Sequence, residues 1–454
     1  MSRSRFGRRV LLAAGSGLLG AAGLGLFFRR RVIQTLARFS KLPEFYETPK
    51  LVQHDPATER RTIYVARDAG PAANVDAVLD RMGGVERLVG VDDVVIIKVS
   101  AQWWNQGMTN VAAVKRVIER IIGRDRFAGE VIVFENVHFR LQNGSGLSRG
   151  WTRPSDRNVD VPGWNKLADL IPHFERLSAP VSFVGLVDAG RNELAHDHWH
   201  DPQHEHGIYG GDGRGPIGPN EDRDGYVWDF ERTFRKKRSY VDYAQTPLTW
   251  PVFSSPRTGV VVDFKDGLFK RENGRRTKID RKLVFVNMPT LVAHGSTGMS
   301  SCCKSPMGIV DMSAGRMGSD PRVADYQSVH HFGSPGAMWR MAGPLAHFAK
   351  HVRQADLYIV TAEWVAAAPK GWDEEANDAR LAVEGAHHAG LVIAGTDPVA
   401  IDTWASHNVL MRLKNADTRE FDLGDPDSKL SRFLRYYREV YGKGTMAPEL
   451  ISVA

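Results

Sequence analysis

Continuous runs of apolar, mostly β-branched residues recur along this chain, and they limit its fold more than any other feature. The runs DDVVIIKVS (92–100) and EVIVFEN (130–136) show no alternation of apolar and polar residues, which is typical of parallel strands buried on both faces. Between them, residues 110–122 have the spacing of an amphipathic helix with valine and isoleucine on one face. This alternation of strands and helices predicts a doubly wound, largely parallel α/β sheet.

The same pattern returns after residue 282, and a long segment of different composition separates the two α/β portions. That segment is rich in Gly, Pro, Asp, Arg and Trp, and its clear elements are a strand at 181–188 and a hairpin at 259–279. We therefore predict four regions: a leader and linker (1–59), a first α/β portion (60–139), a large irregular insertion (140–281) and a second α/β portion with a C-terminal helix (282–454).

The basic charge of the chain is concentrated at its N-terminus. Residues 1–41 hold nine Lys and Arg side chains and no acidic one, so removing them from the net charge of +7 leaves −2 for the rest. The pI of 9.3 therefore gives no indication of nucleic-acid binding, and we expect no nucleic-acid partner.

The N-terminus also has the pattern of an export signal. Arg8 and Arg9 precede a mildly hydrophobic run, 11–28, that is rich in Gly and Ala. This is typical of a twin-arginine signal, whose route carries folded proteins, and the run is also long enough to be an uncleaved membrane anchor. We predict that this segment brings the protein to the membrane or across it, with the body in the periplasm or another extracytoplasmic space.

Polar residues follow a third buried strand and predict a site there. The run LVFVNM ends before Pro289 and is followed by His294, a loop of Gly, Ser and Thr, and Lys304. Lys98 ends the equivalent run in the first portion. Because such strand ends converge on one crevice in a doubly wound fold, we predict that His294, Lys304 and Lys98 bind a small anionic ligand or carry out acid–base catalysis on it. For Lys98, an ion pair with a nearby acid is an equal alternative.

A histidine tract, HDHWHDPQHEH, predicts a metal site. Imidazole is a common ligand of Zn, Cu, Ni and Fe, and a solvated loop with weak metal affinity is the alternative. The predicted ligands to this divalent transition metal are His196, His198, His200, His204 and His206. The two cysteines, Cys302 and Cys303, cannot hold an iron–sulfur cluster by themselves, so we expect none.

Several of these motifs together resemble the family labelled domain of unknown function 362. In the first half they are Ile97-Lys98 at a strand end and Thr109-Asn110 before a helix. In the second half they are Pro289, His294, Thr297-Gly298, Lys304 with Gly308, and the closing segment GTDPVAID at 395–402. The resemblance covers roughly residues 60–135 and 282–410. It implies an α/β fold with a ligand site, in which we assign Thr297, Gly298 and Asp402 to cofactor binding.

The chain departs from the family pattern at several positions. Val99-Ser100 stand where the family has Pro-Asn, Leu291 and Ala293 replace two lysines, and Ser305 replaces an asparagine. The cysteine-rich ferredoxin module of many relatives is missing, so the resemblance does not imply electron transfer.

Three functions follow as hypotheses. The first is an exported or anchored metal-dependent enzyme that acts on a small anionic substrate, and the second is a non-catalytic metal or cofactor carrier that uses the histidine tract. The third is an interaction protein that docks a partner through its Trp-rich insertion, since the chain has 11 Trp.

Asp397 before Pro398 has the pattern of a helix N-cap, while the residues alone leave the role of Asp402 open. The sequence predicts no oligomeric state.

Overall fold

A computed structural model gives the structure of the protein. It describes residues 60–101, 107–135, 151, 154–185, 224–237, 243–295, 297–311, 329, 332, 337–366, 386–413 and 418–454. The chain divides into two units, Met1–Phe45 and Tyr46–Ala454, and every described residue belongs to the second. No helix within these ranges is long and apolar enough to span a bilayer. The predicted export segment and the histidine tract lie outside the described residues.

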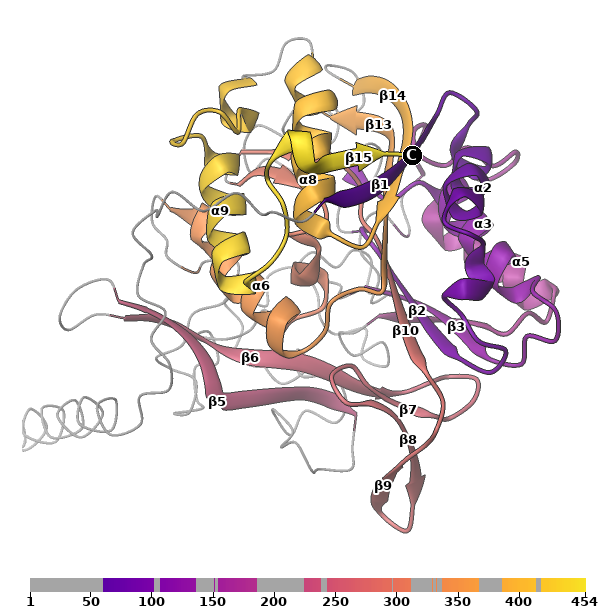
Figure 1. Cartoon of the computed structure of the whole chain (residues 1–454). Coiled ribbons are helices and arrows are strands. Elements are labelled where there is room, and N and C mark those ends of the chain that lie inside the picture. The colour runs from indigo at the N-terminus through magenta and orange to yellow at the C-terminus, as the bar shows by residue number, and fades with distance from the viewer. Residues whose placement is uncertain are drawn as a thin grey trace, which may run out of the picture. The chain divides into compact units, whose positions relative to one another are not determined.

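An eight-stranded sheet forms the centre of the second unit (Figure 1). Its strand order is β15-β1-β14-β13-β10-β2-β3-β4. In this sheet β14 runs antiparallel to its neighbours β1 and β13, and all other neighbours pair in parallel. The predicted α/β class and the largely parallel sheet are therefore confirmed. The strands are β1 (Arg61–Arg67), β2 (Val94–Val99), β3 (Glu130–Glu135), β4 (Val181–Gly185), β10 (Leu283–Met288), β13 (Leu357–Ala366), β14 (Ala386–Gly395) and β15 (Ile451–Val453).

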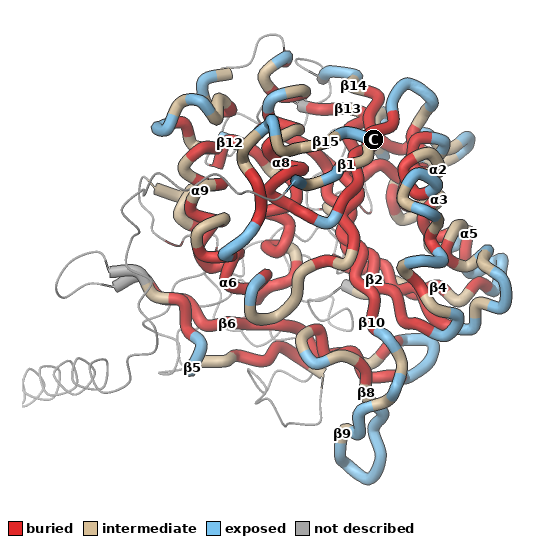
Figure 2. The backbone as a smooth tube through the Cα atoms, viewed as in Figure 1, coloured by how far each residue is buried: buried red, intermediate tan, exposed pale blue. Residues whose placement is uncertain are grey.

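The two predicted α/β portions are joined in this one sheet and are not separate bodies. Strand β1 lies between β14 and β15, and β10 pairs with β2 over their whole lengths. Both β2 and β10 are buried at every position (Figure 2). A strand that is apolar on both faces needs a neighbour on each side and a layer on each face, and each portion supplies these for the other.

Helices cover both faces of the sheet (Figure 1). One face carries α2 (Pro71–Arg81), α3 (Val111–Ile122) and α5 (Leu170–Arg176), and the other carries α6 (Ala342–His351), α8 (Pro398–Asn408) and α9 (Lys429–Tyr441). Alternate residues of each strand enter different cores. Val95 and Ile97 pack with α2 and α3, whereas Val94 and Ile96 pack in the core that includes α6, α8 and α9.

The segment predicted as an irregular insertion contains a second, regular sheet, so that prediction is wrong for residues 225–278. Five antiparallel strands follow one another in chain order. They are β5 (Gly225–Lys237), β6 (Tyr243–Ser254), β7 (Val261–Asp263), β8 (Gly267–Glu272) and β9 (Arg275–Lys278). The predicted hairpin is present as β7–β9, and Asn273 and Gly274 both adopt positive φ at its second turn.

This second sheet packs on the core of the first. Phe264 beside β7 contacts Phe285 of β10, with ring centroids 4.9 Å apart, and Phe234 of β5 lies near Tyr436 of α9. The tryptophans in the described ranges are buried or partly buried, and none is among the exposed large hydrophobic residues there. This part of the chain therefore offers no exposed Trp patch for the interaction hypothesis.

Candidate functional site

The strand order reverses direction between β2 and β10. From β2 the chain proceeds outward through β3 to β4, and it then returns to the other side of β2 with β10 and β13. In open α/β sheets, ligands bind outside the carboxyl ends of the strands at such a reversal. Close to these ends, Phe134, Lys98, Asn287 and Tyr358 are direct neighbours on adjacent strands, so their side chains lie in one row on the same face.

The chain after β10 folds back over this row. It forms a hairpin of β11 (Val292–His294) and β12 (Gly298–Ser300), and then a short 3-10 helix, Ser305–Gly308. The Ser305 hydroxyl donates a hydrogen bond of 2.7 Å to the Asn287 side-chain oxygen. Gly308 lies against Lys98, because a Cβ at this position would be 2.5 Å from Lys98 Cε. The missing side chain thus lets the 3-10 helix approach the lysine.

Lys98 forms a buried ion pair with Glu135, the last residue of β3. Its Nζ lies 3.8 Å from Glu135 Oε1, and both side chains are at most 5% exposed. Burial lowers the pKa of Lys98, and the Glu135 carboxylate opposes this effect. The second Glu135 oxygen accepts a hydrogen bond from the Ala101 N–H. Lys98 therefore has the acidic partner that the ion-pair alternative predicts.

Lys304 is buried beside this pair without an acidic partner. The residue is only 9% exposed, and its amine donates to the Ser300 hydroxyl at 3.1 Å. No carboxylate lies within ion-pair distance of it among the residues that the structure describes. Burial and, as the smaller effect, the positive charge of Lys98 together lower the pKa of Lys304 to about 7. Among the described residues, this cluster therefore holds two amines and one carboxylate, which is paired with Lys98, and it has an excess of positive charge when both amines are protonated.

His294 lies on the same hairpin face as Ser300, the partner of Lys304. The register pairs Val292 with Ser300 and His294 with Gly298, which places these side chains on one face of the hairpin. Ala293 and Met299 point to the opposite face and join the core. His294 and Ser300 are both partly exposed, so this face of the hairpin reaches solvent.

Thr297 and Gly298, predicted to bind a cofactor, have structural roles in this hairpin. The Thr297 hydroxyl donates to the Met299 carbonyl at 2.9 Å. Gly298 has a φ of +79°, and a Cβ there would lie 2.6 Å from Leu430 Cβ, so glycine allows the hairpin to pack on α9. These contacts account for both residues and give no support to cofactor binding.

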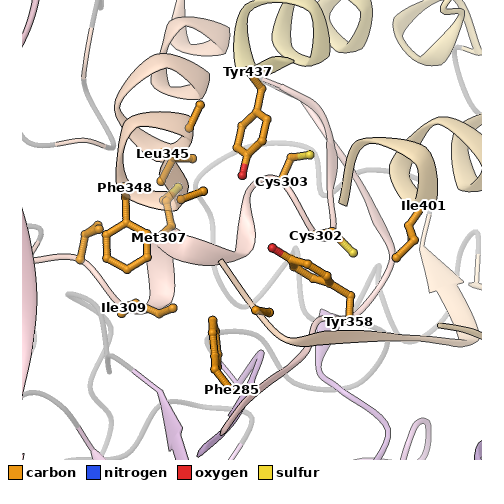
Figure 3. Close-up of a cluster of buried hydrophobic side chains, with 14 of the residues drawn as sticks. Phe285, Cys302, Cys303, Met307, Ile309, Leu345, Phe348, Tyr358, Ile401 and Tyr437 are labelled. Carbon is orange, nitrogen blue, oxygen red and sulfur yellow. The ribbon is translucent and has the colours of Figure 1, made fainter. Parts of the chain in front are cut away.

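Asp402 holds the two adjacent cysteines. Its carboxylate oxygens accept hydrogen bonds from the backbone N–H groups of Cys302 and Cys303, at 3.0 and 2.9 Å. Burial raises the pKa of Asp402 to about 6, and these N–H donors act against the rise. Figure 3 shows the two cysteines in a buried cluster with Tyr358 and Tyr437. Asp402 therefore fixes the turn that leads to Lys304.

Asp397 is the N-cap of α8, as predicted. Its side chain accepts hydrogen bonds from the Val399 and Ala400 N–H groups, and Pro398 occupies the first helical position. The segment GTDPVAID at 395–402 thus contains a helix cap, Asp397, and ends at Asp402, which supports the cysteine turn.

The helix after β2 does not offer a free N-terminus to a phosphate. Asn110 caps α3 by accepting from the Ala113 N–H. The Val111 and Ala112 N–H groups donate to the carbonyls of Asn158 and Val159, at 2.9 and 3.1 Å. Because these donors are occupied, the arrangement that binds phosphate in dinucleotide-binding folds is filled by protein here. The positive charge at the strand ends comes from the lysines.

Sequence reasoning missed Glu135, Asn287 and Ser300. A signal for Glu135 was present, since it is the next-to-last residue of the strand predicted at 130–136, which follows the strand of Lys98. No group of three or more His, Cys, Asp or Glu that could hold a metal is found in the described part. The five tract histidines lie outside the described part.

Residues 260–407 match the model of one protein family, described as Domain of unknown function (DUF362). This match agrees with the resemblance seen in the sequence motifs. The matched range begins next to β7 and includes β10, the hairpin with His294, Lys304 and Asp402. Lys98 and Glu135 lie before the matched range. Comparisons with curated proteins and with solved structures find no match.

Proposed function

We propose that this protein is an enzyme that binds a small anionic substrate, such as a carboxylate or a phosphate, at the carboxyl ends of β2 and β10. The observation that supports it is the buried amine of Lys304, which has a hydroxyl and a second lysine as neighbours but no acid in the described part of the chain. An unpaired buried charge is costly, and an anion would supply the missing partner.

The strand order supports the position of this site. The order β4-β3-β2-β10-β13 reverses at β2 and β10, as it does in a doubly wound sheet, and we infer that topology for the parallel part. Lys98 and Asn287 mark the two strands at the reversal, and Lys304 lies on the loop that covers them.

The pKa of Lys304 suits acid–base work near neutral pH. A group whose pKa is close to the working pH can both give and take a proton. When protonated, Lys304 would attract the anion, and Lys98 would add a second positive charge. His294, partly exposed on the same hairpin face as Ser300, is the second candidate for proton transfer.

Phosphate and acetate binding to the full chain, measured by calorimetry at pH 6 and pH 8, tests this proposal. With a pKa of about 7, Lys304 is mostly protonated at pH 6 and mostly neutral at pH 8, so we expect weaker binding of acetate, which is ionised at both pH values, at pH 8, by up to about tenfold. Lys304→Met should abolish binding, and Lys270→Met, which changes an exposed lysine of β8, should leave it unchanged. Equal binding by wild type and Lys304→Met would refute the site.

The metal requirement of this enzyme is a further part of the proposal, and it rests on the histidine tract at 196–206. The triple change of His196, His198 and His200 to Ala should lower the amount of Zn, Cu, Ni or Fe bound per chain, measured by elemental analysis. Unchanged metal content would end this part of the proposal. If metal binds but no anion does, the carrier hypothesis is favoured.

We also propose that the N-terminus exports or anchors the protein. A fusion of residues 1–45 to a reporter should reach the membrane or the periplasm. Changing Arg8 and Arg9 together to Lys should block this if the twin-arginine route is used, and a reporter that stays in the cytoplasm would contradict the proposal.

A further inference from the structure

We propose that Lys304 is a nucleophile that forms an imine with the carbonyl group of a small carboxylate-bearing substrate, of the 2-oxo acid class. This inference deepens the proposed function and rests on it, because it uses the same anion site and names the substrate class. It assigns different tasks to the two lysines: Lys304 reacts, and Lys98 supplies a fixed positive charge.

The partners of the two amines distinguish these tasks. Lys98 is held by the Glu135 carboxylate in a setting that is almost fully buried. Lys304 has a neutral partner, the Ser300 hydroxyl, on a hairpin face that reaches solvent. An amine without a carboxylate partner can lose its proton without leaving an unpaired anion behind, so Lys304 is the one that can present a lone pair.

The surroundings of Lys304 are those that activate lysines in general. A lysine becomes nucleophilic when it is desolvated or placed beside another cationic group, and Lys304 meets both conditions. Burial and the charge of Lys98 both lower the pKa of Lys304, to about 7, so a large fraction of the amine is neutral at physiological pH.

The neighbouring groups also fit a substrate with a carboxylate next to its carbonyl. Lys304 precedes the 3-10 helix whose last residue, Gly308, lies against Lys98, so both lysines border the same short segment, and we infer that one short anion contacts both amines. The distance between Lys98 Nζ and Glu135 Oε1, 3.8 Å, is longer than a hydrogen bond, which leaves the ammonium able to donate to a substrate carboxylate. The Ser300 hydroxyl lies where it can donate to the carbonyl oxygen once the amine has attacked.

The step balances without a further reactant. The neutral Lys304 nitrogen forms a bond to the carbonyl carbon, and the carbonyl oxygen takes a proton to give a carbinolamine. The nitrogen then expels this oxygen as water after a second protonation, and a C=N bond remains. The two hydrogens of the amine leave with the water in net terms, and nothing is oxidised or reduced.

The test is to trap the imine. The full chain is incubated at pH 7.5 with pyruvate or glyoxylate and then treated with sodium borohydride, which reduces an imine to a stable secondary amine. We expect a mass increase equal to that of the carbonyl compound less one oxygen, located by peptide mapping on Lys304. Trapping should be absent in Lys304→Met and in Lys304→Arg, and it should persist in Lys270→Met.

The controls separate this inference from the proposed function. Lys304→Arg keeps the positive charge but cannot form the imine, so it should still bind phosphate and acetate in calorimetry. If the wild type binds anions but gives no adduct on Lys304, the imine inference is wrong and the anion site stands. If the wild type neither binds anions nor gives the adduct, both the anion site and the imine inference are wrong. Adduct spread over exposed lysines and equal in Lys304→Met would also overturn the inference.

Discussion

Replacing Lys304 with Met should make the protein more stable at neutral pH, which is opposite to the usual effect of changing a buried residue. A pKa lowered from the ordinary 10.5 to about 7 means that the fold disfavours the protonated amine by about 5 kcal/mol, at 1.36 kcal/mol per pH unit. Since the residue is only 9% exposed, solvent screening reduces this value little. Met has a similar length and carries no charge, so the variant avoids this cost.

The sign of the pH dependence follows from proton linkage. The pKa of Lys304 is lower in the folded protein than in the unfolded chain, so between about pH 7 and 10.5 the unfolded chain binds more protons. Wild-type stability should therefore rise with pH across this window, while below pH 7 the full cost is present. The advantage of Lys304→Met should be largest at pH 7 and below and should shrink towards zero near pH 10.

Urea unfolding of wild type, Lys304→Met and Lys270→Met, followed by circular dichroism from pH 6 to pH 10, measures this difference. Lys270→Met should follow the wild type at each pH, because Lys270 is exposed on β8. Added phosphate should stabilise the wild type more than Lys304→Met at pH 6. If the difference in unfolding free energy between wild type and Lys304→Met does not change with pH, the reasoning is refuted. Such a result would mean that Lys304 has the same pKa in the folded and the unfolded protein.

Other changes test the supports of the site. Gly308→Ala should displace the Lys98 ammonium, since the new Cβ would lie 2.7 Å from Lys98 Nζ, and should weaken anion binding several-fold in calorimetry; Gly295→Ala, where the Cβ meets open space, should bind like wild type. Asp402→Ala should lower the free energy of unfolding by about 2–4 kcal/mol, because two buried N–H groups lose their acceptor, and a loss below about 1 kcal/mol would contradict this role. Asp397→Ala should cost about 1 kcal/mol by removing the cap of α8, and an unchanged urea midpoint would argue against the cap.

The elements of this fold were largely predictable from local sequence. The buried runs became β2, β3 and β10, and the amphipathic spacing at 110–122 became α3, which begins one residue later. These predictions succeed because the geometry of a strand or a helix fixes the spacing of its apolar residues. That spacing can be recognised within a short stretch of sequence. The paired strands β5 and β6 escaped prediction because their antiparallel sheet mixes polar and apolar residues, which resembles a loop when the strands are considered one at a time.

The sequence by itself also placed Lys98 and Lys304 near strand ends, since both follow or end a recognisable buried run. It could not decide what each lysine contacts. Only the tertiary structure brings β10 beside β2, sets Glu135 against Lys98 and leaves Lys304 with Ser300. The reason is physical: strand pairing and charge contacts join residues far apart in the chain, and the pKa of an amine depends on the burial and the charges around it rather than on its sequence neighbours.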